Sequence, residues 1–341
     1  METKRFTKTE IFKAAKLLQK GELIAFPTET VYGLGANALM AEAVKKVFAV
    51  KGRPSDNPLI VHVESFDQVK KYVSAIHPMT QQLVNAFWPG PLTLIFKTKA
   101  NAFPKEVSAG LDTVSFRMPN HEATLALIQT AGVPLVGPSA NTSGKPSPTT
   151  SEHVYHDLKG KIAGILEGGP TSIGVESTVL DLSDPLQPPM ILRPGAVTKE
   201  QLEKELGIEV LVDKHLLKES EAPRSPGMKY KHYAPNTKVL MIHSDDWQKA
   251  VAWGNNHQLR IGVLSGPAIA EEVRASTAAV FMYANDSVQS ATKGLFAGLR
   301  ALDDPKLQLD IIFVQTFPEV GLGTAYMNRL KKSAGQKFFE K

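Results

Sequence analysis

The second part of the chain, from residue 238 onward, alternates short apolar runs with stretches of helical period. We predict strands at 239–243, 261–265, 279–284 and 311–316, and helices at 246–256, between the second and third strands, at 287–302 and at the end. Adjacent parallel strands need a crossover connection, which is usually a helix. The alternation therefore predicts a small parallel α/β sheet of Rossmann-like topology.

The region before residue 207 has a less regular order. Thr7 and Glu10 form a capping-box pattern that opens a helix, and residues 27–35 read as a polar, glycine-hinged loop. Strands are predicted at 22–26, 59–63, 92–97, 114–118, 134–136, 162–166, 178–182 and 190–193, and helices around 41–50, 66–76, 79–87, 121–131 and 198–206. Several strands follow one another without a helix, which predicts a twisted mixed sheet.

These patterns divide the chain into three predicted parts. The α/β domain with the mixed sheet covers 1–206, a linker covers 207–236, and the Rossmann-like domain covers 237–341. Prolines and glycines punctuate the end of the linker, at 225–236, and the same span carries Lys229, Lys231, His232 and Tyr233. We expect this segment to act as a lid over a nucleotide site.

Composition excludes several kinds of site. The chain has 341 residues, a formal net charge of +5 and no cysteine, so disulfides, thiolate catalysis and thiolate metal sites are excluded. The mild positive charge permits anionic substrates and a weak RNA contact, but it is far from a dedicated nucleic-acid-binding composition. The chain shows no signal-peptide pattern and no apolar run of membrane-spanning length, so we expect a cytoplasmic protein without membrane contact.

The segment from Lys51 to Leu59 is the most suggestive for chemistry. It contains Lys51 and Arg53, and its prolines at 54 and 58 exclude a helix there, so we expect both cations on a stiff loop. A guanidinium fork beside a compact ammonium suits a polyphosphate. Alone, such a pair is more often a basic surface turn.

Other candidate residues follow predicted strands. The segment 137–147 combines hydroxyls, an amide, a lysine and glycines directly after a strand, as a phosphate-binding loop would. Thr113 and Arg117 lie on one face of a predicted strand, and Arg193 ends another. His62 lies within an apolar strand, where a histidine is more often part of the core than a ligand-binding group.

Two nucleotide-binding fingerprints do not fit. Gly33 and Gly35 match the loose dinucleotide pattern, but Pro27 and Thr28 interrupt the strand that should precede it. Gly144-Lys145 lacks the upstream glycine of a Walker A loop and is followed by proline.

Taken together, these segments resemble the threonylcarbamoyl-AMP synthase family, the YrdC-type enzymes of tRNA modification, in its long two-domain form. The resemblance rests on the ordered motifs at 27–34, 51–54 with 57–59, 88–93, 138–144, 176–178 and 193–195, on the linker at 225–235 and on 321–330. It covers nearly the whole chain and implies a YrdC-like first domain.

The resemblance implies that L-threonine, bicarbonate or CO2, and ATP react to give threonylcarbamoyl-AMP and pyrophosphate. Mg²⁺ would accompany ATP, held mainly by the phosphates rather than by a protein metal site. The product would pass to a tRNA threonylcarbamoyltransferase complex that modifies ANN-decoding tRNAs. By motif, the catalytic residues would be Lys51 and Arg53, the threonine-binding residues Thr30, His62, Arg117 and Ser177, and the ATP-binding residues Arg53, Asn57, Thr113, Ser139, Asn141, Ser147, Arg193 and Tyr233.

Two other classes of function remain open at this stage. An RNA-binding module without turnover would fit the mild positive charge and would show strongly salt-dependent binding. A carbamoyl-transfer protein of the hydrogenase-maturation type shares YrdC-like domains, but that type would carry cysteine-rich zinc fingers, and this chain has no cysteine.

Overall fold

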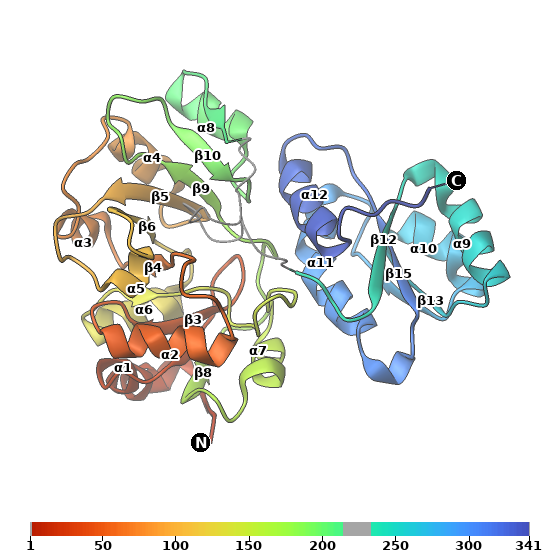
Figure 1. Ribbon diagram of the computed structural model, residues 1–341, viewed down its shortest axis with the longest axis horizontal. Coiled ribbons are helices and arrows are strands. Elements are labelled where there is room, and N and C mark those ends of the chain that lie inside the picture. The colour runs from red at the N-terminus through yellow and green to blue at the C-terminus, as the bar shows by residue number, and fades with distance from the viewer. Residues whose placement is uncertain (1, 214–232, 341) are drawn as a thin grey trace. The chain divides into compact units, whose positions relative to one another are not determined.

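The computed structural model describes residues 2–213 and 233–340, which divide into two compact units (Figure 1). The first unit contains residues 2–143, 148–172 and 176–213. The second contains Gly144–Ser147, Ile173–Val175 and residues 233–340. Two short segments from earlier in the chain therefore belong with the C-terminal residues.

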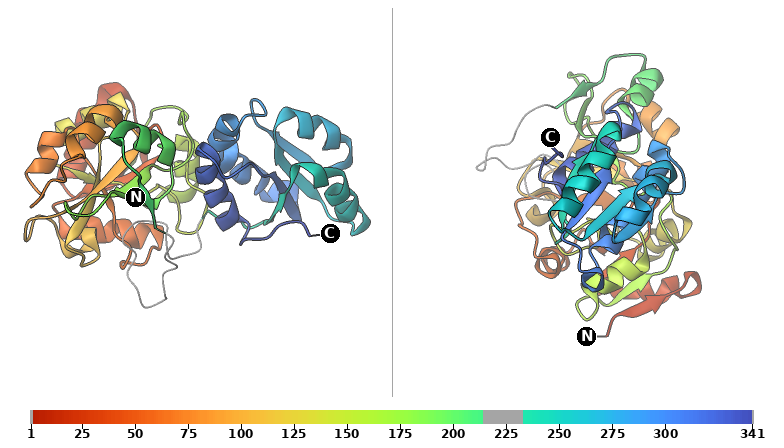
Figure 2. Two further views of the ribbon diagram at one scale, coloured as in Figure 1. Left: turned by 90° about the horizontal axis from the view of Figure 1, so that it is seen from above. Right: turned by 90° about the vertical axis from the view of Figure 1, so that its right-hand side faces the viewer.

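A mixed sheet organises the described part of the first unit (Figures 1 and 2). Its strand order is β1-β8-β2-β3-β7-β4-β6-β5-β9-β10-β11. The strands are β1 (Lys4–Phe6), β2 (Ile24–Phe26), β3 (Gly33–Asn37), β4 (Ile60–His62), β5 (Leu92–Lys97), β6 (Thr113–Arg117), β7 (Leu135–Val136), β8 (Gly164–Leu166), β9 (Thr178–Asp181), β10 (Met190–Arg193) and β11 (Leu211–Val212). The helices are α1 (Ile11–Gln19), α2 (Ala41–Lys51), α3 (Phe66–Lys70), α4 (Thr80–Phe87), α5 (Lys105–Ser108), α6 (Glu122–Ala131), α7 (Ser151–Leu158) and α8 (Lys199–Leu206).

The predicted mixed sheet is confirmed, with several local differences. Residues 33–35, predicted as the end of a loop, belong to strand β3 (Gly33–Asn37), because β3 pairs with β2 on one side and β7 on the other. The sequence also missed β1, α5 and α7, and α3 ends at Lys70 rather than near residue 76. Strand β11 pairs with β10, so residues 211–212 belong to the sheet and not to the predicted linker. Residues 214–232 of that linker, which include 225–232 of the predicted lid, lie outside the described residues.

The end of α2 corrects the prediction for Lys51. The helix runs through Lys51, and Gly52 caps it in the left-handed conformation with φ of 62°. Lys51 is therefore buried on a helix, and the stiff loop begins one residue later.

Two apolar clusters show which faces of this sheet are covered. One cluster joins the apolar side chains of one face, such as Leu94 and Phe116, to residues of α2, α4, α7 and α8. On the other face, α1 and α6 pack over β2 and β7, with Phe26 and Leu135 in that cluster. Farther along this second face, the small cluster of Ile95, Val179 and Leu192 lies among polar side chains. This part of the sheet carries the candidate site.

The second unit contains a parallel sheet with order β12-β15-β13-β14, as the alternating pattern predicted. Its strands are β12 (Lys238–Ile242), β13 (Ile261–Ser265), β14 (Ala279–Met282) and β15 (Ile311–Gln315), and its helices are α9 (Trp247–Asn256), α10 (Pro267–Val273), α11 (Val288–Leu302) and α12 (Leu322–Ser333). Trp247, Ile261 and Phe313 anchor an apolar cluster between α9 and the sheet. No helix in residues 2–213 or 233–340 is long and apolar enough to cross a membrane.

Candidate active site

Strand register brings four predicted residues to one face of the first sheet, namely His62, Arg117, Ser177 and Arg193. His62 of β4 lies directly beside Arg117 of β6 in a parallel pair, so both side chains point to the same face. The β5–β6 register places Thr93 opposite Arg117, and the Thr93 hydroxyl lies 2.8 Å from that of Ser177. Arg193, at the end of β10, donates from Nη2 to the Ser177 carbonyl at 2.9 Å.

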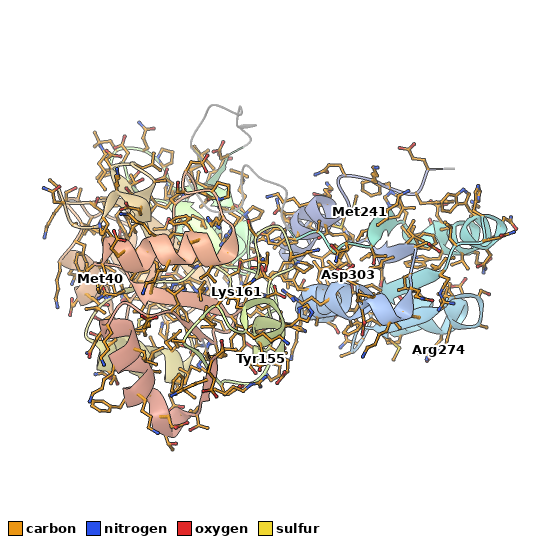
Figure 3. The ribbon with its side chains drawn as sticks, turned by 60° about the horizontal axis from the view of Figure 1, so that its bottom comes forward. Met40, Tyr155, Lys161, Met241, Arg274 and Asp303 are labelled. Carbon is orange, nitrogen blue, oxygen red and sulfur yellow. The ribbon has the colours of Figure 1, made fainter. Side chains whose placement is uncertain are left out.

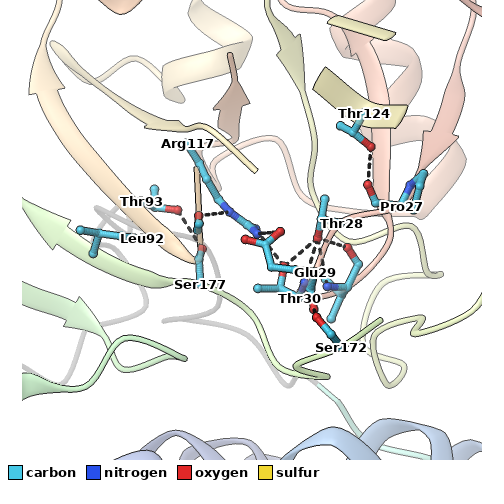
Figure 4. A network of polar contacts seen from close by, with 12 residues as sticks. Pro27, Thr28, Glu29, Thr30, Leu92, Thr93, Arg117, Thr124, Ser172 and Ser177 are labelled. Carbon is cyan, nitrogen blue, oxygen red and sulfur yellow. Dashed lines mark hydrogen bonds and ion pairs between the residues drawn. The ribbon is translucent and has the colours of Figure 1, made fainter. Parts of the chain in front are cut away.

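Arg117 is the centre of the polar network in Figure 4. It is 4% exposed, its Nη1 donates to the Thr30 hydroxyl at 2.9 Å, and its Nε donates to the Gly90 carbonyl at 3.2 Å. Its Nη2 lies 2.7 Å from Oε2 of Glu29, which is 7% exposed. This contact is an ion pair without hydrogen-bond geometry, so both Glu29 oxygens lack a hydrogen-bond donor among the described residues.

Thr28 fixes the loop that presents Glu29 and Thr30. Its hydroxyl accepts from the amides of Thr30 and Val31 at 3.1 and 3.2 Å and lies 2.6 Å from the Val31 carbonyl. The hydroxyl of Thr124, a residue of α6, donates to the carbonyl of Pro27 (Figure 4). The loop is therefore held at its start and at its turn, and Thr30 is fully buried.

His62 is a buried neutral imidazole. Burial, and then the positive charge of Arg117, lower its pKa to about 3. Its ring packs edge-on against Phe26 with centroids 5.2 Å apart, and its Nδ1 has no hydrogen-bond partner among the described residues. A Cβ at Gly137 would come within 2.6 Å of Nδ1, so only glycine allows this approach of the loop. His62 therefore lies in the core, as its apolar strand predicted, and still offers a ring nitrogen to a ligand.

Lys51 holds the loop after β7. Its ammonium donates to the carbonyls of Ser139 and Asn141 at 2.5 and 2.6 Å, and its own carbonyl accepts from the amide of Ser143 at 2.8 Å. Because Lys51 bonds to three residues of the predicted phosphate-binding loop, it acts first as a positioning group.

Asn57 is an unfilled position in the segment between α2 and β4. It is 0% exposed, yet neither its amide nitrogen nor its amide oxygen has a hydrogen-bond partner among the described residues. Arg53, half-buried, donates to the carbonyl of Pro58 at 3.2 Å. Buried amides are nearly always hydrogen-bonded, so this position is suited to a ligand that supplies both a donor and an acceptor.

The remaining predicted contacts lie elsewhere. Thr113 begins β6, about 13 Å along the strand from Arg117, and shares the amino ends of β4 and β6 with Asn57. Ser147 and Tyr233 belong to the second unit, where Tyr233 stacks on Phe296 with ring centroids 5.2 Å apart. The structure thus brings together Thr30, His62, Arg117, Ser177 and Arg193, and separately Lys51, Ser139 and Asn141.

Sequence reasoning missed three contributors to this site. Glu29, Thr28 and Thr93 all contact the predicted residues. Only Thr93 had a readable signal, since it is the polar position in the buried face of an otherwise apolar strand. Among the described residues, no group of three His, Cys, Asp or Glu side chains could hold a metal ion, so the predicted place of Mg²⁺ on the ATP phosphates stays a prediction.

Two family models together match most of this chain. The family model described as "Telomere recombination" matches residues 16–195, and that of the threonylcarbamoyl-AMP synthase C-terminal domain matches 197–335. Threonylcarbamoyl-AMP synthase of Bacillus subtilis is 46% identical over 96% of this chain and 93% of its own, and that of Pyrococcus abyssi is 42% identical over 98% and 97%.

A solved structure extends the likeness to three dimensions. The crystal structure of P. abyssi Sua5 complexed with L-threonine has a TM-score of 0.91 and 40% identity, covering 99% of this chain and 100% of that one. The chain therefore belongs to the threonylcarbamoyl-AMP synthase family.

Proposed function

We propose that this protein is a nucleotidyltransferase that converts L-threonine, bicarbonate or CO2, and ATP into threonylcarbamoyl-AMP and pyrophosphate. The observation that carries the proposal is the buried network of Glu29, Thr30 and Arg117 beside His62. Full-length relatives named threonylcarbamoyl-AMP synthase, and a similar structure complexed with L-threonine, support it.

The network matches the groups of an amino acid. The guanidinium of Arg117 and the hydroxyl of Thr30 would bind the threonine carboxylate, and Glu29 would receive the ammonium. The neutral ring of His62 offers an unpartnered Nδ1 for a hydrogen bond to the substrate. Ser177, already bonded to Thr93, would add a hydroxyl contact.

Two bond-forming steps would follow. The neutral threonine amine would attack the carbon of CO2, one C=O π bond would open, and the nitrogen would lose a proton to leave a carbamate. With bicarbonate as the source, that proton would combine with the hydroxide that bicarbonate releases, and water would leave. A carbamate oxygen then attacks the α-phosphorus of ATP, and the bond from that phosphorus to the pyrophosphate oxygen breaks. Nucleophile and leaving group are both anionic, so positioning and charge neutralisation contribute more than a strong base.

The chain's cations would provide part of that neutralisation. Arg193 is buried beside Ser177, and Arg53 is half-buried and donates to the carbonyl of Pro58, the residue after Asn57. Lys51 would act on ATP mainly by holding the loop of Ser139 and Asn141. Mg²⁺ bound to the ATP phosphates would offset further negative charge. Contacts from Thr113, Ser147 and Tyr233 to the nucleotide remain predictions.

The product would serve a second enzyme. A mixed carbamic–phosphoric anhydride is reactive in water, so we expect direct use by a tRNA threonylcarbamoyltransferase complex in the cytoplasm. That complex would modify the adenosine beside the anticodon of ANN-decoding tRNAs, and RNA contact by this chain itself would be weak.

A pyrophosphate-release assay tests the activity. Release should require threonine and bicarbonate together, and mass spectrometry should detect the acyl adenylate. Serine in place of threonine should lose about 10- to 200-fold in kcat/KM, because one methyl group in an apolar pocket is worth about 1 to 3 kcal/mol. Orthophosphate release instead of pyrophosphate, or indifference to threonine, would contradict the proposal.

A further inference from the structure

Helix α11 contacts three other segments of the second unit along one stripe of residues. The stripe consists of Thr292, Phe296 and Arg300, with Asp303 at the helix end. Spacings of three and four residues place these positions on one face of a helix. Two of the three contacted segments, Gly144–Ser147 and Ile173–Val175, come from far earlier in the chain.

Arg300 fastens the Gly144–Ser147 turn. Its Nε and Nη2 both donate to the carbonyl of Pro146, at 3.1 and 2.6 Å. The turn is bonded further through the amide of Ala234, which donates to the carbonyl of Gly144 at 2.8 Å, and through Lys145, which donates to the side chain of Asn236.

Gly174 brings the second segment onto the backbone of the same helix. A Cβ at this position would lie 2.5 Å from the carbonyl oxygen of Lys293 and 2.8 Å from that of Thr292. The φ of Gly174 is also +88°, a conformation that side chains disfavour. Both constraints indicate that Ile173–Val175 is built to lie directly on α11.

The third segment is the chain just before β12. Tyr233 stacks on Phe296, and Asp303 accepts from the amides of Asn236 and Thr237 at 2.9 and 2.7 Å (Figure 3 labels Asp303). One helix face thus fixes the Pro146 turn, the Gly174 segment and the residues around Tyr233.

We propose that α11 is a positioning helix for ATP use, with Arg300 as its principal side chain. The loop after β7 is continuous from Ser139 through Asn141 to Ser147, and Lys51 holds its first half. Arg300 holds its second half through Pro146. The loop is therefore restrained at both ends. This inference rests on the proposed function, since it assigns to that loop the binding of ATP.

Steady-state kinetics of Arg300→Ala test the inference. We expect KM for ATP to rise about tenfold, which corresponds to about 1.4 kcal/mol, while kcat and the Kd of L-threonine stay within twofold. Arg300→Lys keeps the charge but loses the planar fork and should be intermediate. The matched control is Arg260→Ala, because Arg260 also donates from Nε and Nη2 to one carbonyl, that of Leu307, at 3.3 and 3.1 Å.

The outcomes separate the two levels of the proposal. A wild-type protein that releases no pyrophosphate from ATP would remove the proposed function itself. An active wild type with the same KM for ATP in Arg300→Ala and Arg260→Ala would overturn the role of α11. If Arg300→Ala does not fold, Arg300→Lys and Gly174→Ala carry the test, and an unchanged KM for ATP in both would likewise overturn it.

Discussion

The two units treat their buried polar groups differently. In the second unit, the hydroxyls of Tyr283 and Tyr326 lie 3.0 Å apart, and that of Tyr326 donates to the carbonyl of Gln315 at 2.6 Å. The Gln315 side chain accepts in turn from the amide of Gly266 at 2.8 Å. In the first unit, the side-chain amide of Asn57 and Nδ1 of His62 are buried without hydrogen-bond partners among the described residues.

This difference separates groups that stabilise the fold from groups kept for a ligand. A buried polar group without a partner costs about 1 to 3 kcal/mol, so such groups persist where binding a ligand satisfies them. Exceptions in the second unit include Trp247, whose Nε1 has no hydrogen-bond partner among the described residues, but Trp247 lies among apolar side chains of the core there. In the first unit, His62 instead lies beside Arg117 of the ion pair, and Asn57 directly precedes Pro58, whose carbonyl accepts from Arg53.

We expect the largest effect on activity from replacing Arg117 of the ion pair, where the first unit would bind its ligand. Arg117→Met should lower threonine-dependent pyrophosphate release by about 1000-fold, because it removes a preorganised cation from the place where the substrate carboxylate would bind. Glu29 would remain as an unpaired buried charge and destabilise the fold. The double variant Arg117→Met with Glu29→Gln removes that charge and should recover stability but not activity. Recovered activity in the double variant would assign the pair to the fold alone.

Asn57 offers a second test with an internal control. Asn57→Ala should raise KM for ATP about 10- to 100-fold and keep or raise the free energy of unfolding, since it removes a buried amide that makes no hydrogen bond in the described structure. Asn37 is also buried in the first unit, but its side chain accepts from the amide of Leu39 at 3.0 Å. Asn37→Ala should therefore lose about 1 kcal/mol of stability with KM unchanged. The reverse pattern in chemical denaturation and kinetics would contradict this division.

The sequence predicted best what depends on neighbours in the chain. The alternation after residue 238 is local, and each predicted strand and helix there is present within a few residues. Strand β3 was missed because its two glycines and asparagine suit a turn, whereas pairing with β2 and β7 makes it a strand. Those pairings join segments that no local pattern connects.

The same limit applies to the site. The motifs identified Thr30, His62, Arg117, Ser177 and Arg193, and the register of β4, β5 and β6 brings most of them together. Glu29 was not assigned, because its partner Arg117 lies 88 residues later in the chain. The membership of Gly144–Ser147 in the second unit was equally invisible, since it depends on Arg300.

The third prediction uses the pKa of His62. Its folded value is about 3, whereas an unfolded histidine titrates near 6.5, so below pH 6.5 the unfolded chain binds a proton that the folded chain does not. Stability should therefore fall with pH between 6.5 and 3, by about 2 kcal/mol from pH 6.5 to 5. His62→Asn should show a denaturation midpoint that depends less on pH over this range. Equal pH dependence in both proteins would mean that His62 is not buried as a neutral ring.

We expect the smallest effect from the second unit, where the buried hydroxyls of Tyr283 and Tyr326 are hydrogen-bonded. Tyr326→Phe removes the hydroxyl that contacts Tyr283 and Gln315, and it should lower the free energy of unfolding by about 1 to 2 kcal/mol, because the Gln315 carbonyl then loses a buried donor. Tyr283→Phe leaves the bond from Tyr326 to Gln315 in place and should cost less. Neither variant should change KM for ATP or threonine, because the hydroxyl pair contacts none of the predicted site residues. A kinetic change larger than the loss of stability would show that this part of the parallel sheet also affects catalysis, and the contrast between the two units would then fail.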